Sequence, residues 1–92
     1  MGSHYAYDKE KYSLLDAPSE KEQNGIESTD ETVRLLLKCL DFATLGELGC
    51  DQEDVERLRR AEYVDAFAAE GGSIVYRITP KGVEALQRDY LS

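Results

Sequence analysis

Apolar residues recur at helical spacing in residues 28–40. These apolar positions lie three or four residues apart and would share one face of a helix: Val33, Leu36, Leu37 and Leu40. Residue types that cap helix N-termini stand just before them, at Ser28, Thr29 and Asp30. The pattern predicts a core helix that begins at one of these three residues.

A short helix is expected next, over residues 44–48. Thr44 is suited to cap it, and Leu45 and Leu48 supply its apolar positions. Gly49 is suited to end it, because glycine readily adopts the left-handed backbone conformation found after helices. A tight turn should follow.

A third helix is the strongest helical pattern in the chain. Asp51 stands at its expected N-cap, and Val55, Leu58 and Ala61 are expected to face inward. We therefore predict a helix over residues 51–62.

The period of the pattern changes from helical to alternating over residues 64–79. Apolar residues alternate on both sides of Gly71 and Gly72, a dipeptide suited to the positive φ angles of a tight hairpin turn. A two-residue turn there would place Phe67 opposite Tyr76 on one apolar face. The sequence therefore predicts a two-stranded hairpin.

A last helix should follow the hairpin directly. Thr79 is suited to cap it, with Pro80 at its first position, where a missing amide hydrogen costs nothing. Its buried stripe is expected to consist of Val83, Leu86 and Tyr90. The predicted fold class is mainly α with a β-hairpin.

Residues 1–27 differ in composition and pattern from residues 28–92, and we expect residues 28–92 to form the domain. Tyr5, Tyr12 and Leu15 would share one face of a short N-terminal helix or arm, and a polar linker rich in charges follows. This arm is expected to pack onto the rest of the domain or onto a second subunit.

The charge balance limits the classes of partner. The chain has 11 Lys plus Arg and 19 Asp plus Glu, with a formal net charge of -8. Such a chain does not bind nucleic acid or anionic membrane by bulk attraction, so any contact with nucleic acid must be local. An acidic surface is also typical of halophile proteins, in which case the charge says little about partners.

The sequence contains no recognisable set of residues for a catalytic or metal centre. Cys39 and Cys50 stand eleven residues apart and the one histidine, His4, is remote, so neither a zinc site nor a catalytic triad can be assembled. There is no phosphate-binding glycine loop and no apolar run long enough to span a membrane. We expect a cytoplasmic protein that is not an enzyme and has no cofactor.

The stretch "LRRAEYVDAF…EGGSIVYRITPKGVEAL" resembles the winged helix-turn-helix superfamily, in particular small transcriptional regulators of the MarR and PadR type. The resemblance covers about residues 28–92. It implies that residues 44–48 form the support helix and residues 51–62 the helix inserted in the major groove of DNA. The hairpin would be the wing, with residues 70–73 at its tip.

The resemblance also implies a set of residues that contact double-stranded DNA. The outward positions of the inserted helix would be Gln52, Glu53, Glu56, Arg57 and Arg60, and Arg77 and Lys81 would flank the wing. By their chemistry, Gln52 suits adenine, whereas Arg57 or Arg60 suits guanine or a phosphate.

Two features of the charge pattern favour an alternative, a module that binds a basic protein partner. The first turn of the third helix holds Asp51, Glu53 and Asp54, which repel phosphate, and the wing tip holds no Lys or Arg. The acids also stand four residues before arginines, so Glu53 with Arg57, and Glu56 with Arg60, are expected to form ordinary surface ion pairs.

A homodimer is a further expectation. The apolar surface assigned to its interface comes from the arm and the last helix: Tyr5, Tyr12, Leu15, Leu86, Tyr90 and Leu91.

Overall fold

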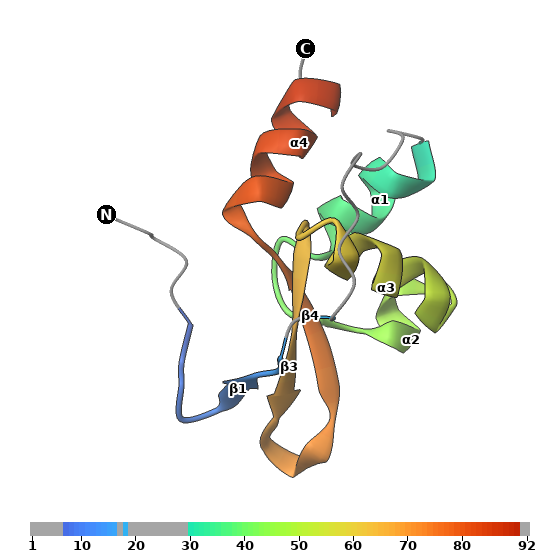
Figure 1. Ribbon diagram of the computed structural model, residues 1–92. Coiled ribbons are helices and arrows are strands. Elements are labelled where there is room, and N and C mark those ends of the chain that lie inside the picture. Colours follow the sequence, from blue (N-terminus) through green and yellow to red (C-terminus); the bar gives the residue numbers. More distant parts are fainter. Residues whose placement is uncertain (1–6, 17, 19–29, 91–92) are drawn as a thin grey trace.

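The computed structural model describes residues 7–16, 18 and 30–90 of the chain. Within these residues it has four α-helices and four β-strands (Figure 1). In chain order they are β1 (Tyr12–Leu14), α1 (Asp30–Lys38), β2 (Ala43–Thr44), α2 (Leu45–Leu48), α3 (Gln52–Arg60), β3 (Val64–Ala69), β4 (Ile74–Ile78) and α4 (Pro80–Tyr90). A 3-10 turn over Glu70–Gly72 joins β3 to β4.

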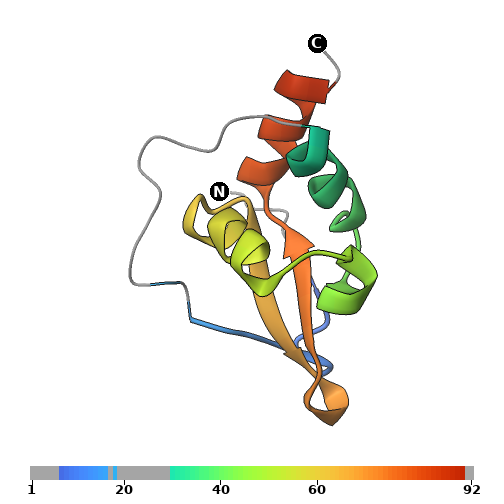
Figure 2. The ribbon, with the colours of Figure 1, turned by 90° about the vertical axis from the view of Figure 1, so that its right-hand side faces the viewer.

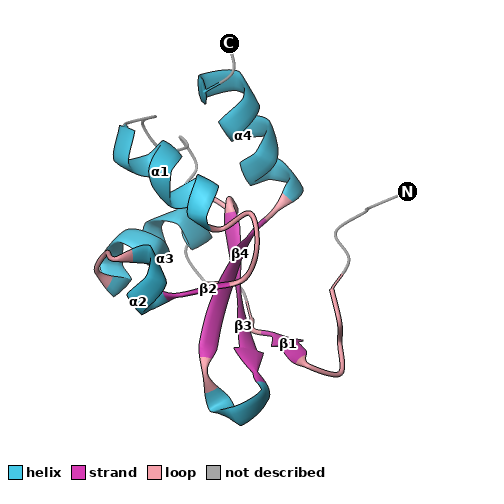
Figure 3. Ribbon diagram, turned by 180° about the vertical axis from the view of Figure 1, so that it is seen from behind, coloured by secondary structure: helices cyan, strands magenta, loops and turns pink. Residues whose placement is uncertain are grey.

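The four strands form one antiparallel sheet in the order β1-β3-β4-β2. The hairpin β3–β4 is its centre, and the two short strands extend it on either side. Helices α1, α2 and α3 lie on one side of this sheet, and β1 forms its edge beside β3 (Figures 1 and 3). Helix α4 continues from the end of β4 and packs against α1 (Figure 2).

The fold is therefore mixed α/β, with more sheet than the sequence indicated. The helices over residues 30–38, 45–48, 52–60 and 80–90 and the hairpin were all predicted. The two outer strands were not, because each has only two or three residues and gives no measurable alternation. Both of them pair with edges that an isolated hairpin would leave open.

The register of the hairpin differs from the prediction by one residue. Phe67 lies opposite Val75, and Ala66 lies opposite Tyr76. The connection is a three-residue turn rather than a two-residue one, with Gly71 at φ 88°. Because a shift of one residue moves a side chain to the other face, Phe67 and Tyr76 lie on opposite faces of the sheet.

The main core lies between the helices and the near face of the sheet. It joins buried apolar side chains of every helix to the sheet residues Val64, Ala66, Tyr76 and Ile78. Val55 and Leu58 of α3 are buried there, and so is Ala61 at its C-cap, as the helical spacing predicted.

Helix α1 is rotated from its predicted orientation. Its buried side chains are Leu35 and Leu36, followed by Cys39 just after the helix. Leu37 and Leu40, which were expected in the core, are 36% and 52% exposed. The apolar run "LLL" fits either orientation, so packing against the sheet and α4 decided which leucines are buried.

The junction between β4 and α4 follows the predicted capping. The Thr79 hydroxyl accepts a hydrogen bond from the Gly82 amide at 3.0 Å and donates one to the Glu62 carbonyl at 2.6 Å. The α carbon of Gly82 lies so close to the backbone of Tyr63 that a Cβ at this position would overlap the Tyr63 carbonyl oxygen. The threonine and the glycine together fix how closely α4 packs.

The described part of the N-terminal arm forms a strand, β1, rather than a helix. Tyr12 pairs with Ala69 of β3, and the Leu15 amide donates to the Ala66 carbonyl at 2.9 Å. Of the two expected roles, the described part of the arm therefore packs onto its own domain. No helix among the described residues is long and apolar enough to cross a membrane.

Candidate functional site

Helix α3 presents a polar face to solvent along its whole length. It begins after Asp51, whose extended backbone (φ -76°, ψ 154°) is that of an N-cap residue. Asp51 makes no side-chain capping hydrogen bond, contrary to the prediction, so its carboxylate stays exposed beside those of the first turn. Gln52, Glu53 and Arg57 are exposed as expected.

The ion pairs on α3 are not the predicted ones. Glu56 binds Arg59, three residues later, at 3.0 Å, rather than Arg60. Arg59 also donates to the Asp16 carbonyl of the arm at 2.8 Å, a contact between residues 43 positions apart. This second bond holds the Arg59 guanidinium on one side of α3, where Glu56 can reach it.

Arg57 and Arg60 have no partner among the residues that the structure describes. Among the described residues, neither makes a hydrogen bond or an ion pair, and Glu53 makes none with Arg57. Arg57 is exposed and Arg60 is half-buried. The second half of α3 therefore carries two uncompensated positive charges, whereas the first turn carries uncompensated negative ones.

The tip of the hairpin gains basic neighbours that the sequence analysis missed. The Glu70 amide donates to the Lys11 carbonyl at 3.1 Å, which brings the turn at residues 8–11 beside the tip. Lys9 and Lys11 are both exposed. The alternation of Tyr12, Ser13 and Leu14 was the only signal for this placement, and it is too short to predict a strand by itself.

Arg77 and Lys81, the bases expected to flank the hairpin, are both engaged within the chain. The Arg77 guanidinium lies 5.2 Å from the centre of the Phe42 ring, a cation–π distance, and on the same sheet face as Phe67. Lys81 lies 3.7 Å from Glu62, and both side chains are about half exposed. An exposed pair of this kind is weak, so Lys81 is the freer of the two bases.

The residues assigned to a dimer interface are mostly used within the chain or lie outside the described part. Leu86 is 7% exposed in the core, Leu15 packs against that core, and Tyr12 stacks on Phe42 at 3.9 Å. Tyr5 and Leu91 lie outside the described residues, as does the side chain of Tyr90. Leu86 is therefore not an interface residue, because it is buried beneath its own helix.

Neither cysteine is activated. Burial raises the pKa of Cys39 from 9.0 to about 12, with a further contribution from Cys50. Burial also raises the pKa of Cys50, and the nearby carboxylates of Asp54, Glu31 and Asp51 add to the rise. Both are protonated thiols at neutral pH and poor nucleophiles. Among the described residues, no group of His, Cys, Asp and Glu is arranged to hold a metal ion.

Comparison of the chain with protein-family models, with curated proteins and with solved structures finds no match in any of the three.

Proposed function

We propose that this chain is a small DNA-binding transcriptional regulator, a winged helix-turn-helix protein of the kind that its sequence resembles. The order of elements supports the finer fold. Helix α1 leads through the short strand β2 to α2 and α3, and the hairpin follows, with β2 pairing on β4. In this arrangement α2 is the support helix, α3 enters the major groove and the hairpin is the wing.

The observation that carries the proposal is the free state of Arg57 and Arg60. Had these arginines been paired with Glu53 and Glu56, the face of α3 would be a neutral, solvated surface. Because Arg59 takes Glu56 and Glu53 forms no pair with Arg57, two guanidinium groups remain for phosphate or guanine. Gln52 is exposed about one and a half turns before Arg57, and its side-chain amide is suited to bind adenine.

The arm strengthens the wing in this proposal. Wings that reach DNA use basic side chains, and the tip itself has none. Lys9 and Lys11, held beside Glu70 by strand pairing, supply that charge. Asp8 and Glu10 alternate with them, so the gain is local contact rather than a basic patch.

The acidic first turn sets the approach of DNA. Asp51 and Glu53 repel phosphates, so the duplex would meet α3 mainly through its second half and the wing. Such a complex has few phosphate contacts. The logarithm of its affinity should therefore fall only gently with the logarithm of the salt concentration.

Fluorescence anisotropy with mixed genomic duplexes, from low to high salt, tests the proposal. We expect salt-sensitive binding, and we expect Arg57→Ala with Arg60→Ala to abolish it or to lower the salt slope by about 2. Lys9→Ala with Lys11→Ala should lower the slope less. Arg88→Ala, which removes an exposed charge on α4, is the matched control. A folded protein that binds no duplex at low salt would refute the proposal.

A second candidate is a module that binds a basic protein surface. The specific observation is that Asp51 makes no capping bond, so Asp51 and Glu53 both offer free carboxylates. Absence of DNA binding, together with loss of a basic partner on Asp51→Asn with Glu53→Gln, would favour this function. Retention of that partner by the variant would exclude it.

Homodimerisation is a separate proposal, since regulators of this kind read paired half-sites. The exposed side chains of Leu37 and Leu40 on the α1 side supply apolar surface for it. Sedimentation equilibrium that shows only monomer at high concentration would contradict it.

A further inference from the structure

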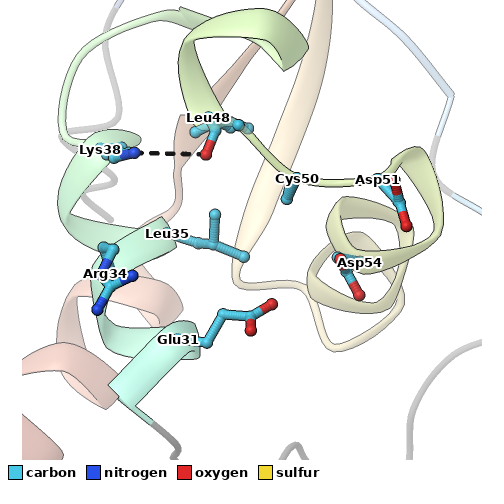
Figure 4. Close-up of a pocket in the computed structure, with 9 residues that line it drawn as sticks. Glu31, Arg34, Leu35, Lys38, Leu48, Cys50, Asp51 and Asp54 are labelled. Atoms are coloured by element: carbon cyan, nitrogen blue, oxygen red, sulfur yellow. Dashed lines mark hydrogen bonds between the residues drawn. The ribbon is translucent and has the colours of Figure 1, made fainter.

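A hollow of about 330 Å³ lies between α1 and the turn that joins α2 to α3 (Figure 4). Sites for small molecules commonly measure about 300 to 1,000 Å³, so this one has room for a compact ligand. It is separate from Arg57 and Arg60, which do not line it. Its walls come from the three helices and the turn between α2 and α3: Glu31, Arg34, Leu35 and Lys38 from α1, Leu48 from the end of α2, Gly49, Cys50 and Asp51 from the turn, and Asp54 from α3.

The lining of the hollow is mostly polar, with a few buried apolar residues on its inner side. Leu35 and Leu48 are buried in the core, and Cys50 is half-buried between α1 and α3 (Figure 4). Gly49 adopts a left-handed conformation (φ 67°) that ends α2 and turns the chain toward α3. This turn separates α1 from the start of α3 and leaves the space between them.

The rim is charged, with both signs present. Glu31 on α1 and Asp54 on α3 extend their carboxylates toward the space between the two helices (Figure 4). Arg34 lies on α1, one turn from Glu31. Among the described residues, none of these three makes an ion pair or a hydrogen bond through its side chain. The rim therefore presents charges that do not neutralise one another.

The other base of the rim is partly used. The Lys38 ammonium donates to the Leu48 carbonyl at 3.4 Å, which ties α1 to the end of α2. Arg34 is thus the base available to a ligand. Burial raises the pKa of Cys50, the carboxylates of Asp54, Glu31 and Asp51 raise it further and Lys38 lowers it, so acidic side chains outnumber basic ones around this thiol.

We propose that this hollow binds a small molecule that carries both an ammonium group and a carboxylate, as amino acids do. Its ammonium lies between Glu31 and Asp54, its carboxylate meets Arg34, and its carbon chain contacts Leu35. The ammonium supplies a counter-ion to two carboxylates that line the same hollow and have no ion pair among the described residues. A bidentate bond from the guanidinium fixes the other end and selects against plain amines.

This proposal does not rest on DNA binding, and each half of the ligand can be tested by itself. Backbone NMR spectra are followed while 4-aminobutyrate, butylamine or butyrate is added to the full chain. We expect 4-aminobutyrate to shift the amide signals around Gly49, Cys50 and residues 31–38 in a saturable way. Butylamine should bind about tenfold more weakly, and butyrate should not bind.

Variants then separate binding in the hollow from non-specific effects. Asp54→Asn and Glu31→Gln should each weaken binding of 4-aminobutyrate by about tenfold, and Arg34→Ala should reduce it to the level of butylamine. Glu84→Gln and Arg88→Ala, two exposed charges on α4, should leave it unchanged. The spectrum of each variant reports whether it is folded, and Glu31→Gln serves should Asp54→Asn fail to fold.

Three outcomes overturn the proposal. The first is the absence of saturable shifts with 4-aminobutyrate. The second is equal binding of 4-aminobutyrate and butylamine, which would remove the role of Arg34. The third is unchanged binding by folded Asp54→Asn or Glu31→Gln, which would place the ligand elsewhere.

Discussion

The two faces of the sheet are covered by different parts of the chain and by different chemistry. The near face packs on helices through mostly aliphatic side chains, such as Val64, Ala66 and Ile78. The far face carries an aromatic cluster built around Phe67, which contacts Tyr7 at 4.7 Å and Phe42 at 5.1 Å between ring centres. Phe67 is completely buried although no helix of the described residues covers it.

The far face of the hairpin is covered because the described part of the arm folds back over it. Tyr7 and Tyr12 come from the arm, and Tyr12 stacks on Phe42 at an interplanar angle of 9°. The change in amino-acid composition near residue 27 therefore does not mark the boundary between an independent arm and a complete domain. The described part of the arm completes the burial of Phe67, and it also brings Lys9 and Lys11 beside the hairpin tip.

The largest expected effect tests whether the far face is a true core. Phe67→Ala should lower the free energy of unfolding by about 3–5 kcal/mol, since it leaves a cavity beneath Tyr7 and Phe42. Leu36→Ala on the near face should cost a similar amount, about 2–5 kcal/mol. Urea denaturation measures both. A cost below about 1 kcal/mol for Phe67→Ala would mean that the arm covers the far face only loosely.

A second, smaller effect probes the tight packing of the near face, at the start of α4. Gly82→Ala should destabilise the fold by about 1–3 kcal/mol, because the new methyl group overlaps the Tyr63 carbonyl and Ile78. Helix propensity alone would instead favour alanine by about 1 kcal/mol.

Gly46→Ala in α2 is the control for this change. A Cβ there meets only the Thr44 hydroxyl oxygen, at 3.9 Å, so this substitution should be neutral or slightly stabilising. Melting temperatures from circular dichroism would show the two variants moving in opposite directions. A stable Gly82→Ala variant would show that α4 can shift away from Tyr63.

The smallest expected effect comes from a substitution that loosens the arm and leaves the main core intact. Tyr12→Ala removes a stacked pair that contributes about 0.5–1.5 kcal/mol beyond its buried area. Hydrogen exchange should then speed up selectively at the Leu15 and Glu70 amides, which bond across the arm. The Ile78 amide, which donates to the Cys39 carbonyl within the main core, should keep its protection.

Ser13→Ala is the control in the same exchange experiment, since its exposed side chain makes no hydrogen bond among the described residues. Equal loss of protection at Leu15, Glu70 and Ile78 would show that the two faces open as one cooperative unit.

Local signals in the sequence were enough for the elements whose pattern is long or whose termini carry specific residues. The Thr44 cap, the left-handed Gly49 and the Thr79 cap all have the predicted roles, and Glu47 completes a capping box with Thr44 that was not predicted. These features act over three or four residues, so neighbours in sequence determine them. The exposed positions Gln52, Glu53 and Arg57 followed from the same helical period.

Errors arose where two partners compete for one residue or where the partner lies far along the chain. Glu56 was expected to form an ion pair with Arg60 but forms one with Arg59. The reason is that the Asp16 carbonyl of the arm orients the Arg59 guanidinium. The register of the hairpin depended on the number of residues in its turn, and the aromatic face depended on a strand of three residues. Helical spacing alone also left open which leucines of α1 face inward.

The sequence by itself determined the order of the helices and the hairpin, the Thr44 and Thr79 caps, and the acidic charge that limits any contact with nucleic acid to local sites. Only the tertiary structure decided that the described part of the arm is a strand, which arginines of α3 are unpaired among the described residues, and that Glu31 and Asp54 line the same hollow. The physical reason is range: hydrogen bonding and periodicity act along a few residues, whereas pairing, burial and unpaired charge depend on segments brought together from distant parts of the chain.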